Sequence, residues 1–224
     1  MIFVGSGALL WRAVRHAGDR GHVVDLVCTA PGRQPADPGV GSNRLRYTED
    51  VNELAGDLRA ACTDGVVWSI DNKFIFRAPV LDLGLRIRNV HGGLLPDYRG
   101  LPLATVPYAL LNGEAEYGAT LHEVVARVDA GAVLAEERFP VDPEDTFEDV
   151  MMELVEACHT LFVDNLDDVV AGRETPRPQP SGGAYYGLRA LHDVVNHRSS
   201  PNYSRATDLG MFEDYYPEAA QAWR

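Results

Sequence analysis

The sequence predicts an α/β fold in which a mostly parallel sheet is flanked by helices. Short apolar, β-branched runs are typical of buried strands, and amphipathic segments lie between them. Stretches rich in Gly, Pro and Asp separate these runs where the chain must turn. Apolar residues make up 46% of the 224 residues, which is sufficient for a real core. Strands that alternate with helices in this way indicate a doubly wound sheet.

The N-terminal part supplies the first strands and helix. Residues 2–4 and 22–30 are apolar runs typical of buried strands. Between them, the tight turn Gly5-Ser6-Gly7 is expected to open a helix over 8–17. The composition of residues 31–44, rich in Pro, Gly and Asp, predicts a loop.

A second helix and two further strands complete the first half of the chain. Thr48 is expected to cap this helix. Three apolar side chains define its buried face: Leu54, Leu58 and Ala61. Residues 66–70 and 85–89 then read as strands, which extends the alternating pattern of a parallel sheet.

The second half predicts a helix followed by a pair of strands. Residues 106–114 are helical in pattern and end at Asn112-Gly113, a typical C-terminal signal. Residues 119–128 and 132–141 are expected to be two strands that flank the turn 129–131.

The strongest helical pattern runs from Phe147 to Val170. Its apolar residues keep i, i+3, i+4, i+7 spacing, and Thr146 and Asp149 stand where a capping pair would. Its apolar face is expected to be core or a homodimer surface. We expect one main domain over residues 1–173 and a linker with a short C-terminal extension over 174–224.

Charge and composition exclude several classes of function. The formal net charge is −13, with 20 basic against 33 acidic residues, which disfavours nucleic-acid binding. Three widely spaced cysteines predict reduced thiols rather than disulfides or a zinc site, and no metal is expected. No apolar run is long enough to span a bilayer. We therefore expect a cytoplasmic protein without membrane partners.

Polar side chains gather where the predicted strands end. Asn89 and His91 stand two residues apart, so a strand would place them on the same face. Farther along, GATLHEVVARVDAG supplies Thr120, His122 and Asp129, the last at a Gly-flanked turn. These groups are either structural polar residues or a ligand site, because open α/β sheets bind ligands at the carboxyl ends of their strands.

Four sequence elements in register resemble the folate-dependent formyltransferases. They are N-V-H-x-x-L-L-P-x-Y-R-G, Y-A-L-L-N-G-E, G-A-T-L-H-E-V and V-D-A-G. The family includes glycinamide ribonucleotide, methionyl-tRNA, amino-sugar and hydroxyornithine formyltransferases. The resemblance, between Ile70 and Val141, implies the Rossmann-like formyltransferase fold. It also implies that N10-formyltetrahydrofolate donates a formyl group to an amine.

The resemblance assigns the catalytic positions to Asn89, His91 and Asp129. Formyl transfer develops negative charge on the formyl oxygen, which Asn89 can stabilise by donating a hydrogen bond. His91 can stabilise the same charge and exchange protons near neutral pH. Asp129 can orient His91 or hold a proton-relaying water. Thr120 and His122 match a Thr and a second His that the family places near this centre, as substrate-binding or supporting residues.

The resemblance also indicates the walls of the folate site, in two segments listed by position: Phe74, Ile75 and Phe76, then Val124, Val125 and Val128. Buried packing is the alternative role for the three residues of the first segment. Gly5, Ser6 and Gly7 open a helix and could bind a phosphate of the acceptor. A plain turn is the favoured interpretation because the third glycine of G-x-G-x-x-G is absent.

The expected acceptor is a small amine, either a nucleotide-linked amino sugar or a non-protein amino acid. The segment after Gly172 is shorter than the β-barrel domain of methionyl-tRNA enzymes, and the acidic charge opposes tRNA. Two alternatives are a formyltetrahydrofolate hydrolase and a catalytically idle scaffold that binds folate or a protein partner. Gly93 departs from the Ser usual in the family, which keeps the idle scaffold open.

Overall fold

The computed structural model describes residues 1–32 and 39–223. Their contacts define two compact units, which share β7, β8 and α5 along the chain. Unit 1 comprises Met1–His91, Leu121–Ala135 and His159–Pro178. Unit 2 comprises Gly92–Thr120, Glu136–Cys158 and Gln179–Arg224. The predicted boundary between residues 173 and 174 stays a prediction.

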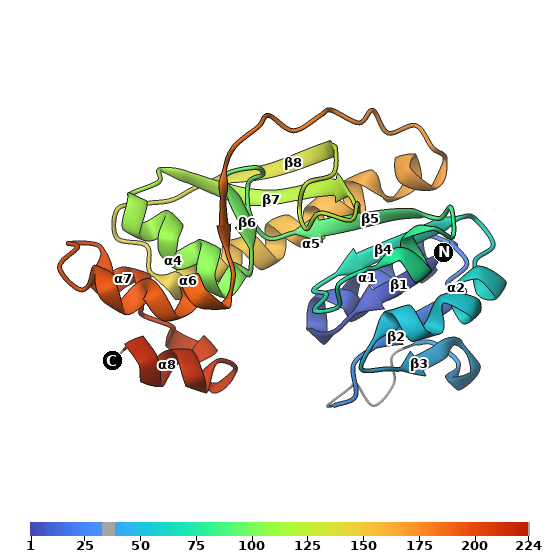
Figure 1. Cartoon of the computed structure of the whole chain (residues 1–224), viewed down its shortest axis with the longest axis horizontal. Helices are drawn as coiled ribbons and strands as arrows, with labels where there is room; N and C mark the ends of the chain where they lie inside the picture. The colour runs from blue at the N-terminus through green and yellow to red at the C-terminus, as the bar shows by residue number, and fades with distance from the viewer. Residues whose placement is uncertain (33–38, 224) are drawn as a thin grey trace. The chain divides into compact units, whose positions relative to one another are not determined.

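A seven-stranded sheet has the strand order β3-β2-β1-β4-β5-β7-β8. Its strands are β1 (Ile2–Gly5), β2 (Leu26–Thr29), β3 (Leu45–Tyr47), β4 (Val66–Ile70), β5 (Arg86–His91), β7 (Glu116–Glu123) and β8 (Val133–Pro140). The five strands from β3 to β5 in this order pair in parallel. Figure 1 shows β1, β2 and β4 side by side in the blue to green part of the chain. The predicted mostly parallel sheet is confirmed.

Helices pack on both faces of the sheet in unit 1. The helical elements of unit 1 are α1 (Gly7–Asp19), α2 (Ala55–Ala61), α3 (Ala78–Leu81), the 3-10 turns η1 (Ser42–Arg44) and η2 (Val51–Leu54), and the end of α5 (Phe147–Val170), although η1 has no buried residue. On one face, Val4 and Val67 belong to a buried cluster that includes Leu58 of α2. On the other, Phe3 and Trp68 pack edge-on against Phe162 of α5, with ring centroids 5.9 and 4.8 Å apart. Alternate residues of one strand thus serve two cores.

Unit 2 contains α4 and most of the C-terminal chain. Its elements are β6 (Tyr98–Gly100), α4 (Pro102–Asn112), β9 (Ala184–Tyr186), α6 (Leu188–Asp193), η3 (Val194–His197), α7 (Tyr203–Ala206), η4 (Gly210–Asp214) and α8 (Pro217–Trp223). β6 and β9 pair in parallel. Arg205 of α7 donates to the carbonyl oxygens of Asp145 and Leu110, so the C-terminal helices are fastened to α4 and to the start of α5.

Local features confirm several helix ends and correct others. Thr146 and Asp149 cap α5 through their side chains, as predicted. Thr48 is not the cap of the second helix: the Asp50 carboxylate accepts from the Asn52 amide and caps η2, which leads into α2. The predicted helix over 106–114 begins four residues earlier, at Pro102.

Strand lengths differ from the sequence predictions. β2 is confined to Leu26–Thr29, so residues 22–25 and 30 of the predicted strand lie outside it. β5 continues through His91, two residues beyond the predicted end. β7 stops at Glu123, so residues 124–128 form a loop rather than a strand. Within the predicted loop 31–44, residues 33–38 lie outside the described part.

Among residues 1–32 and 39–223, no helix has both the length and the apolar character needed to cross a lipid bilayer.

Candidate active site

The predicted Asn–x–His pair lies at the end of β5 in unit 1. Asn89 and His91 are two residues apart on this strand and therefore share a face of the sheet. The parallel register of β4 with β5 pairs Ser69 with Asn89. His91 is 5% exposed and Asn89 half-buried. Two neighbouring strands thus deliver three polar side chains to one edge of an apolar sheet.

A chain of hydrogen bonds holds the Asn89 carboxamide. The side-chain nitrogen Nδ2 of Asn72 donates to Ser69 Oγ at 3.0 Å, and Ser69 Oγ donates to Asn89 Oδ1 at 2.7 Å. Asn89 Nδ2 lies 3.0 Å from His122 Nε2. The other ring nitrogen, His122 Nδ1, lies 2.7 Å from the Glu123 carbonyl oxygen. The carboxamide is therefore held from both sides.

Asp129 approaches both histidines from the loop after β7. Its carboxylate oxygens lie 3.6 Å from His122 Nε2 and 3.9 Å from His91 Nδ1. Asp129 has a φ of 50°, a conformation that Asp tolerates better than most residues. The loop can return close to Glu123 because Gly131 has no Cβ, which would collide with the Glu123 carbonyl oxygen. Asn89, His91, His122 and Asp129 are thus brought together within unit 1.

Burial keeps His122 neutral. Desolvation lowers the pKa of His122 to about 4; the charge of His91 lowers it further, while the charge of Asp129 opposes the shift. A carbonyl oxygen can only accept, so the Nδ1 atom of His122 carries the proton toward Glu123. In this tautomer Nε2 accepts, and the hydrogen bond from Asn89 Nδ2 satisfies it.

The first predicted folate segment, residues 74–76, is only partly buried. Phe76 belongs to the buried cluster, and Phe74 packs against that cluster from outside. The side chain of Ile75 is 55% exposed. The Asn52 side chain donates to the Ile75 carbonyl oxygen and accepts from the backbone amide of Arg77. The segment 74–76 therefore exposes a short apolar surface, and Asn52 holds its backbone in place.

The second predicted folate segment lies in the loop after β7. Val124 packs against the buried cluster, whereas Val125 is 42% exposed and Val128 is half-buried. The Val124 amide donates to the Ile87 carbonyl oxygen at 3.0 Å, which ties the start of the loop to β5. Val125 and Val128 therefore retain apolar surface that a ligand can contact.

The Gly5-Ser6-Gly7 turn is already engaged by Asp71. The Ser6 amide donates to the Asp71 carbonyl oxygen at 3.1 Å, and the Ser6 hydroxyl does so at 3.3 Å. A Cβ on Gly7, which has a φ of 75°, would stand 2.5 Å from the Asp71 carboxylate. A phosphate at this helix start would therefore meet a neighbouring carboxylate, and the phosphate role stays a prediction.

Thr120 supports the backbone of the segment that follows His91 in sequence. Its hydroxyl donates to the Gly93 carbonyl oxygen at 2.8 Å and accepts from the Leu95 amide at 3.2 Å. Both contacts lie within unit 2, and Thr120 is fully buried. The proton of this hydroxyl is thus already used by the protein.

One group of potential metal ligands occurs among the described residues: Asp25, Cys62 and Asp64. The amino group of Met1 contacts both carboxylates, at 2.7 Å for Asp25 and 3.2 Å for Asp64. A cation is therefore already present beside these acids.

A sequence profile of the family described as formyl transferase matches residues 19–166. The chain belongs to the formyltransferase family. The matched segment includes Asn89, His91, His122 and Asp129, and the resemblance inferred from the sequence is confirmed.

A relative of this chain is longer than the chain itself. The methionyl-tRNA formyltransferase of Lactobacillus delbrueckii subsp. bulgaricus is 40% identical over 137 residues, which are 61% of this chain and 41% of the relative. The chain thus spans less than half the length of this curated relative.

Two solved structures share the fold. A sugar N-formyltransferase from Shewanella has a TM-score of 0.74 at 19% identity, covering 92% of this chain and 85% of its own. An N-formyltransferase from Helicobacter canadensis, in complex with folinic acid and dTDP-3-aminofucose, has a TM-score of 0.70 at 20% identity. It covers 92% of this chain and 79% of its own.

The structure adds residues to the candidate site that sequence reasoning missed. Ser69 lies within the predicted strand 66–70, and Asn72 begins the segment 72–76 expected beside the folate, but neither side chain is assigned a role, although two polar residues so close to an apolar run are a usable signal. A hollow of about 440 Å³ in unit 2 was also missed. Its lining residues are Tyr108, Tyr185, Tyr186, Gly187, Leu188, Arg189, Ala190 and Asp193. The Tyr-Tyr pair before Gly187 was visible as a sequence signal.

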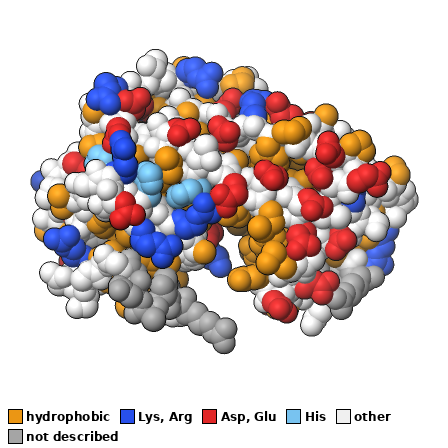
Figure 2. All heavy atoms as spheres, turned by 180° about the vertical axis from the view of Figure 1, so that it is seen from behind, with side chains coloured by type: hydrophobic (Ala, Val, Ile, Leu, Met, Phe, Trp, Pro, Cys, Tyr) orange, Lys and Arg blue, Asp and Glu red, His pale blue; other side chains and the backbone are white. Residues whose placement is uncertain are grey.

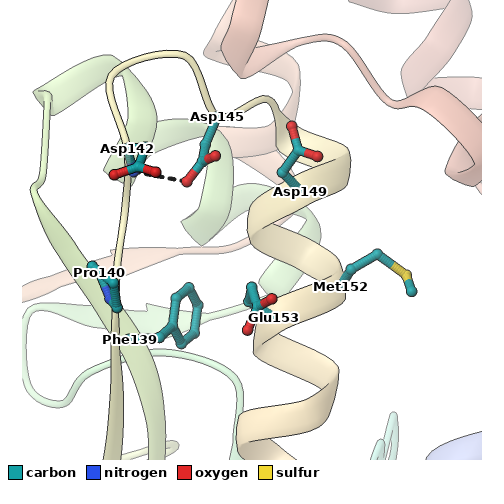
Figure 3. Close-up of a pocket in the computed structure, with 7 residues that line it drawn as sticks. All are labelled: Phe139, Pro140, Asp142, Asp145, Asp149, Met152 and Glu153. Carbon is teal, nitrogen blue, oxygen red and sulfur yellow. Dashed lines mark hydrogen bonds between the residues drawn. The ribbon is translucent and has the colours of Figure 1, made fainter.

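A second hollow, of about 420 Å³, is lined by acids at the start of α5 (Figure 3). Asp145 accepts from the Asp142 amide, and Asp149 caps α5 through Thr146. These carboxylates satisfy local backbone groups, and we assign no chemistry to them.

The pH dependence of stability tests the neutral state of His122. Because its folded pKa is lowered from 6.5 to about 4, the unfolded chain binds a proton that the folded chain refuses between these values. The contribution of neutral His122 to the free energy of unfolding is therefore fully present above pH 6.5. It is lost as the pH falls toward 4, by up to about 1.4 kcal/mol per pH unit.

Urea unfolding of the wild type and of His122→Gln between pH 7 and pH 4.5 measures the contribution of His122 to the pH dependence of the unfolding free energy. We expect a smaller loss of unfolding free energy on acidification in the variant, in which that protonation is absent. Equal slopes in the two proteins would contradict a neutral, buried His122.

Proposed function

We propose that the protein is an N-formyltransferase that moves a formyl group from N10-formyltetrahydrofolate to the amine of a small molecule. The observation that carries this proposal is the carboxamide of Asn89, held by Ser69 and His122 beside the pair of His91 and Asp129. One N–H of Asn89 donates to His122, and among the described residues no other side chain takes its second N–H. That N–H is the donor that a formyl oxygen requires.

Unit 1 also has surface suited to the folate. Ile75 and Val125 are exposed apolar side chains, and Phe74 adds a half-buried ring on the segments predicted to contact the pterin. Flat apolar surface with backbone groups nearby is typical of sites for planar ligands. When bound, the folate supplies the activated formyl group.

The residues of the site divide the work of transfer. Asn89 donates a hydrogen bond to the formyl oxygen as negative charge develops there. His91 accepts the proton that the attacking amine loses and returns it to N10, the nitrogen whose bond to the formyl carbon breaks. Asp129, whose carboxylate lies 3.9 Å from His91 Nδ1, orients the His91 ring for this exchange. One C–N bond forms to the amine and one breaks at N10, and the proton that the amine loses is returned to N10, so the reaction balances.

For the acceptor, we propose a nucleotide-linked amino sugar. The Helicobacter canadensis structure holds dTDP-3-aminofucose with folinic acid, and the Shewanella structure is of a sugar N-formyltransferase. In this chain, Tyr186 lies against Tyr98 and Tyr108, with ring centroids 5.6 and 4.7 Å apart. Tyr185 and Leu188 expose apolar surface in the same hollow, which suits the flat face of a nucleobase.

Three alternatives have different support. Methionyl-tRNA is the acceptor named by the curated relative. Against it stand 33 acidic and 20 basic residues, and Figure 2 shows acids spread over one face of the molecule. A hydrolase would pass the formyl group to water, and an idle scaffold would bind folate without turnover. Product analysis by mass spectrometry distinguishes all of these: a formylated amine, formylated tRNA, free formate, or no product.

The role of Asn89 is tested by Asn89→Ala. Turnover should fall by about two to three orders of magnitude, the scale of one lost oxyanion donor. Binding of 5-formyltetrahydrofolate, measured by calorimetry, should change little because the interaction strengthens mainly in the transition state. Wild-type turnover in both Asn89→Ala and Asp129→Ala would place the catalytic centre elsewhere.

The acceptor is tested by Tyr185→Ala, with Tyr215→Ala as the matched control. Tyr215 is 74% exposed in the same unit and does not line the hollow. The KM for a dTDP-linked amino sugar should rise about tenfold in Tyr185→Ala, since one aromatic–base stack is worth roughly 1–3 kcal/mol. The KM for the folate should stay constant in both variants. A rise that is equal in both variants, or turnover only with methionyl-tRNA, would contradict the nucleotide-linked acceptor.

A further inference from the structure

Ser69 is a polar residue within an otherwise apolar strand. All five residues of β4 are buried, and Ser69 is 1% exposed. A hydroxyl removed from water must form hydrogen bonds or destabilise the fold. Ser69 forms two: it accepts from Asn72 and donates to Asn89.

The hydrogen bonds around Asn89 run in one direction. At one end, neutral His122 donates through Nδ1 to the Glu123 carbonyl oxygen, so its Nε2 can only accept. Asn89 must therefore present its NH₂ group to His122 and its oxygen to Ser69. At the other end, Ser69 Oγ receives an N–H from Asn72, which leaves its own proton for Asn89.

A flipped Asn89 carboxamide would break this pattern on both sides. Its oxygen would face the accepting Nε2 of His122, and the Ser69 hydroxyl would lose the oxygen to which it donates. Only the observed orientation satisfies all four side chains and leaves one N–H of Asn89 available.

We propose that Ser69 is a positioning residue that holds the Asn89 carboxamide in the orientation that leaves an N–H for the formyl oxygen. This inference rests on the proposed formyl transfer. Ser69 does not touch the reacting atoms; it acts through Asn89. Without its hydroxyl, Asn89 Oδ1 loses its hydrogen-bond donor, and the carboxamide is held by His122 alone.

Steady-state kinetics of Ser69→Ala tests this role. The kcat should fall about three- to tenfold, the range expected for one neutral hydrogen bond, while the Kd for 5-formyltetrahydrofolate stays constant. Ser69→Thr restores the hydroxyl and should recover most of the kcat. Near-ultraviolet circular dichroism of each variant reports whether the core is retained. Wild-type kcat in a folded Ser69→Ala would overturn the proposal.

A double-mutant cycle separates positioning from a general structural effect. If Ser69 acts through Asn89, Ser69→Ala should cause no further loss of kcat in the Asn89→Ala background. The same fold-loss in both backgrounds would overturn the proposal.

A measurement without turnover keeps this inference apart from the proposed function. If the wild type formylates no amine, the proposed function fails. The ¹³Cγ and side-chain ¹⁵N resonances of Asn89 then report on its carboxamide. We expect them to shift in Ser69→Ala and to return toward wild-type values in Ser69→Thr. Unchanged resonances in Ser69→Ala would show that Ser69 does not hold Asn89.

Discussion

The parallel register of β4 with β5 brings Ser69 and Asn89 together, and the hydrogen-bond chain of the site depends on this pair. It pairs Ser69 with Asn89 and Ile70 with Val90, so a shift by one residue would turn Asn89 away from Ser69. The apolar neighbours enforce this register: Val67 and Ile87 are buried in one core, and Trp68 packs against Phe162 in the other. Hydrophobic burial therefore sets the geometry of a polar hydrogen-bond chain.

The opposite face of β5 carries a buried ion cluster. Arg88 and Glu174, each less than 10% exposed, are 2.7 Å apart, and Glu123 lies 3.5 Å from the same guanidinium. Such a cluster adds little net stability over an apolar core, but removing one partner is costly because it leaves a buried charge. It joins β5, β7 and the chain after α5. Asn89 and His122 thus lie next in sequence to two members of this cluster.

Buried electrostatics distinguishes the two histidines of the candidate site. His122 is held neutral by desolvation and donates to a backbone carbonyl oxygen, so it serves as a hydrogen-bond acceptor for Asn89. His91 lies at the strand end with Nδ1 3.9 Å from the Asp129 carboxylate, which is also 3.6 Å from His122 Nε2. The two rings differ because Nδ1 of His122 is bound to a backbone carbonyl oxygen.

Sequence periodicity predicted most of unit 1 and the long helix α5, since apolar spacing reflects burial on one face. It also placed Asn89 and His91 together, because residues two apart on a strand share a face. It did not predict the contact of Ser69 with Asn89, since strand pairing brings together residues that are distant in sequence. The end of β7 at Glu123 was missed because Val124 and Val125 have high strand propensity, while the turn at Asp129 and Gly131 determines the path. The short C-terminal helices have too few turns to show a period.

The tautomer of His122 tests the central claim most directly. Nitrogen-15 NMR of the histidine side chains, with His122 assigned by comparison with His122→Gln, reports which ring nitrogen carries a proton. The hydrogen-bond chain predicts that His122 at pH 7 is neutral, protonated at Nδ1 and unprotonated at Nε2. A His122 that is protonated at Nε2, or at both nitrogens, would contradict the orientation of Asn89 on which the proposed formyl transfer depends.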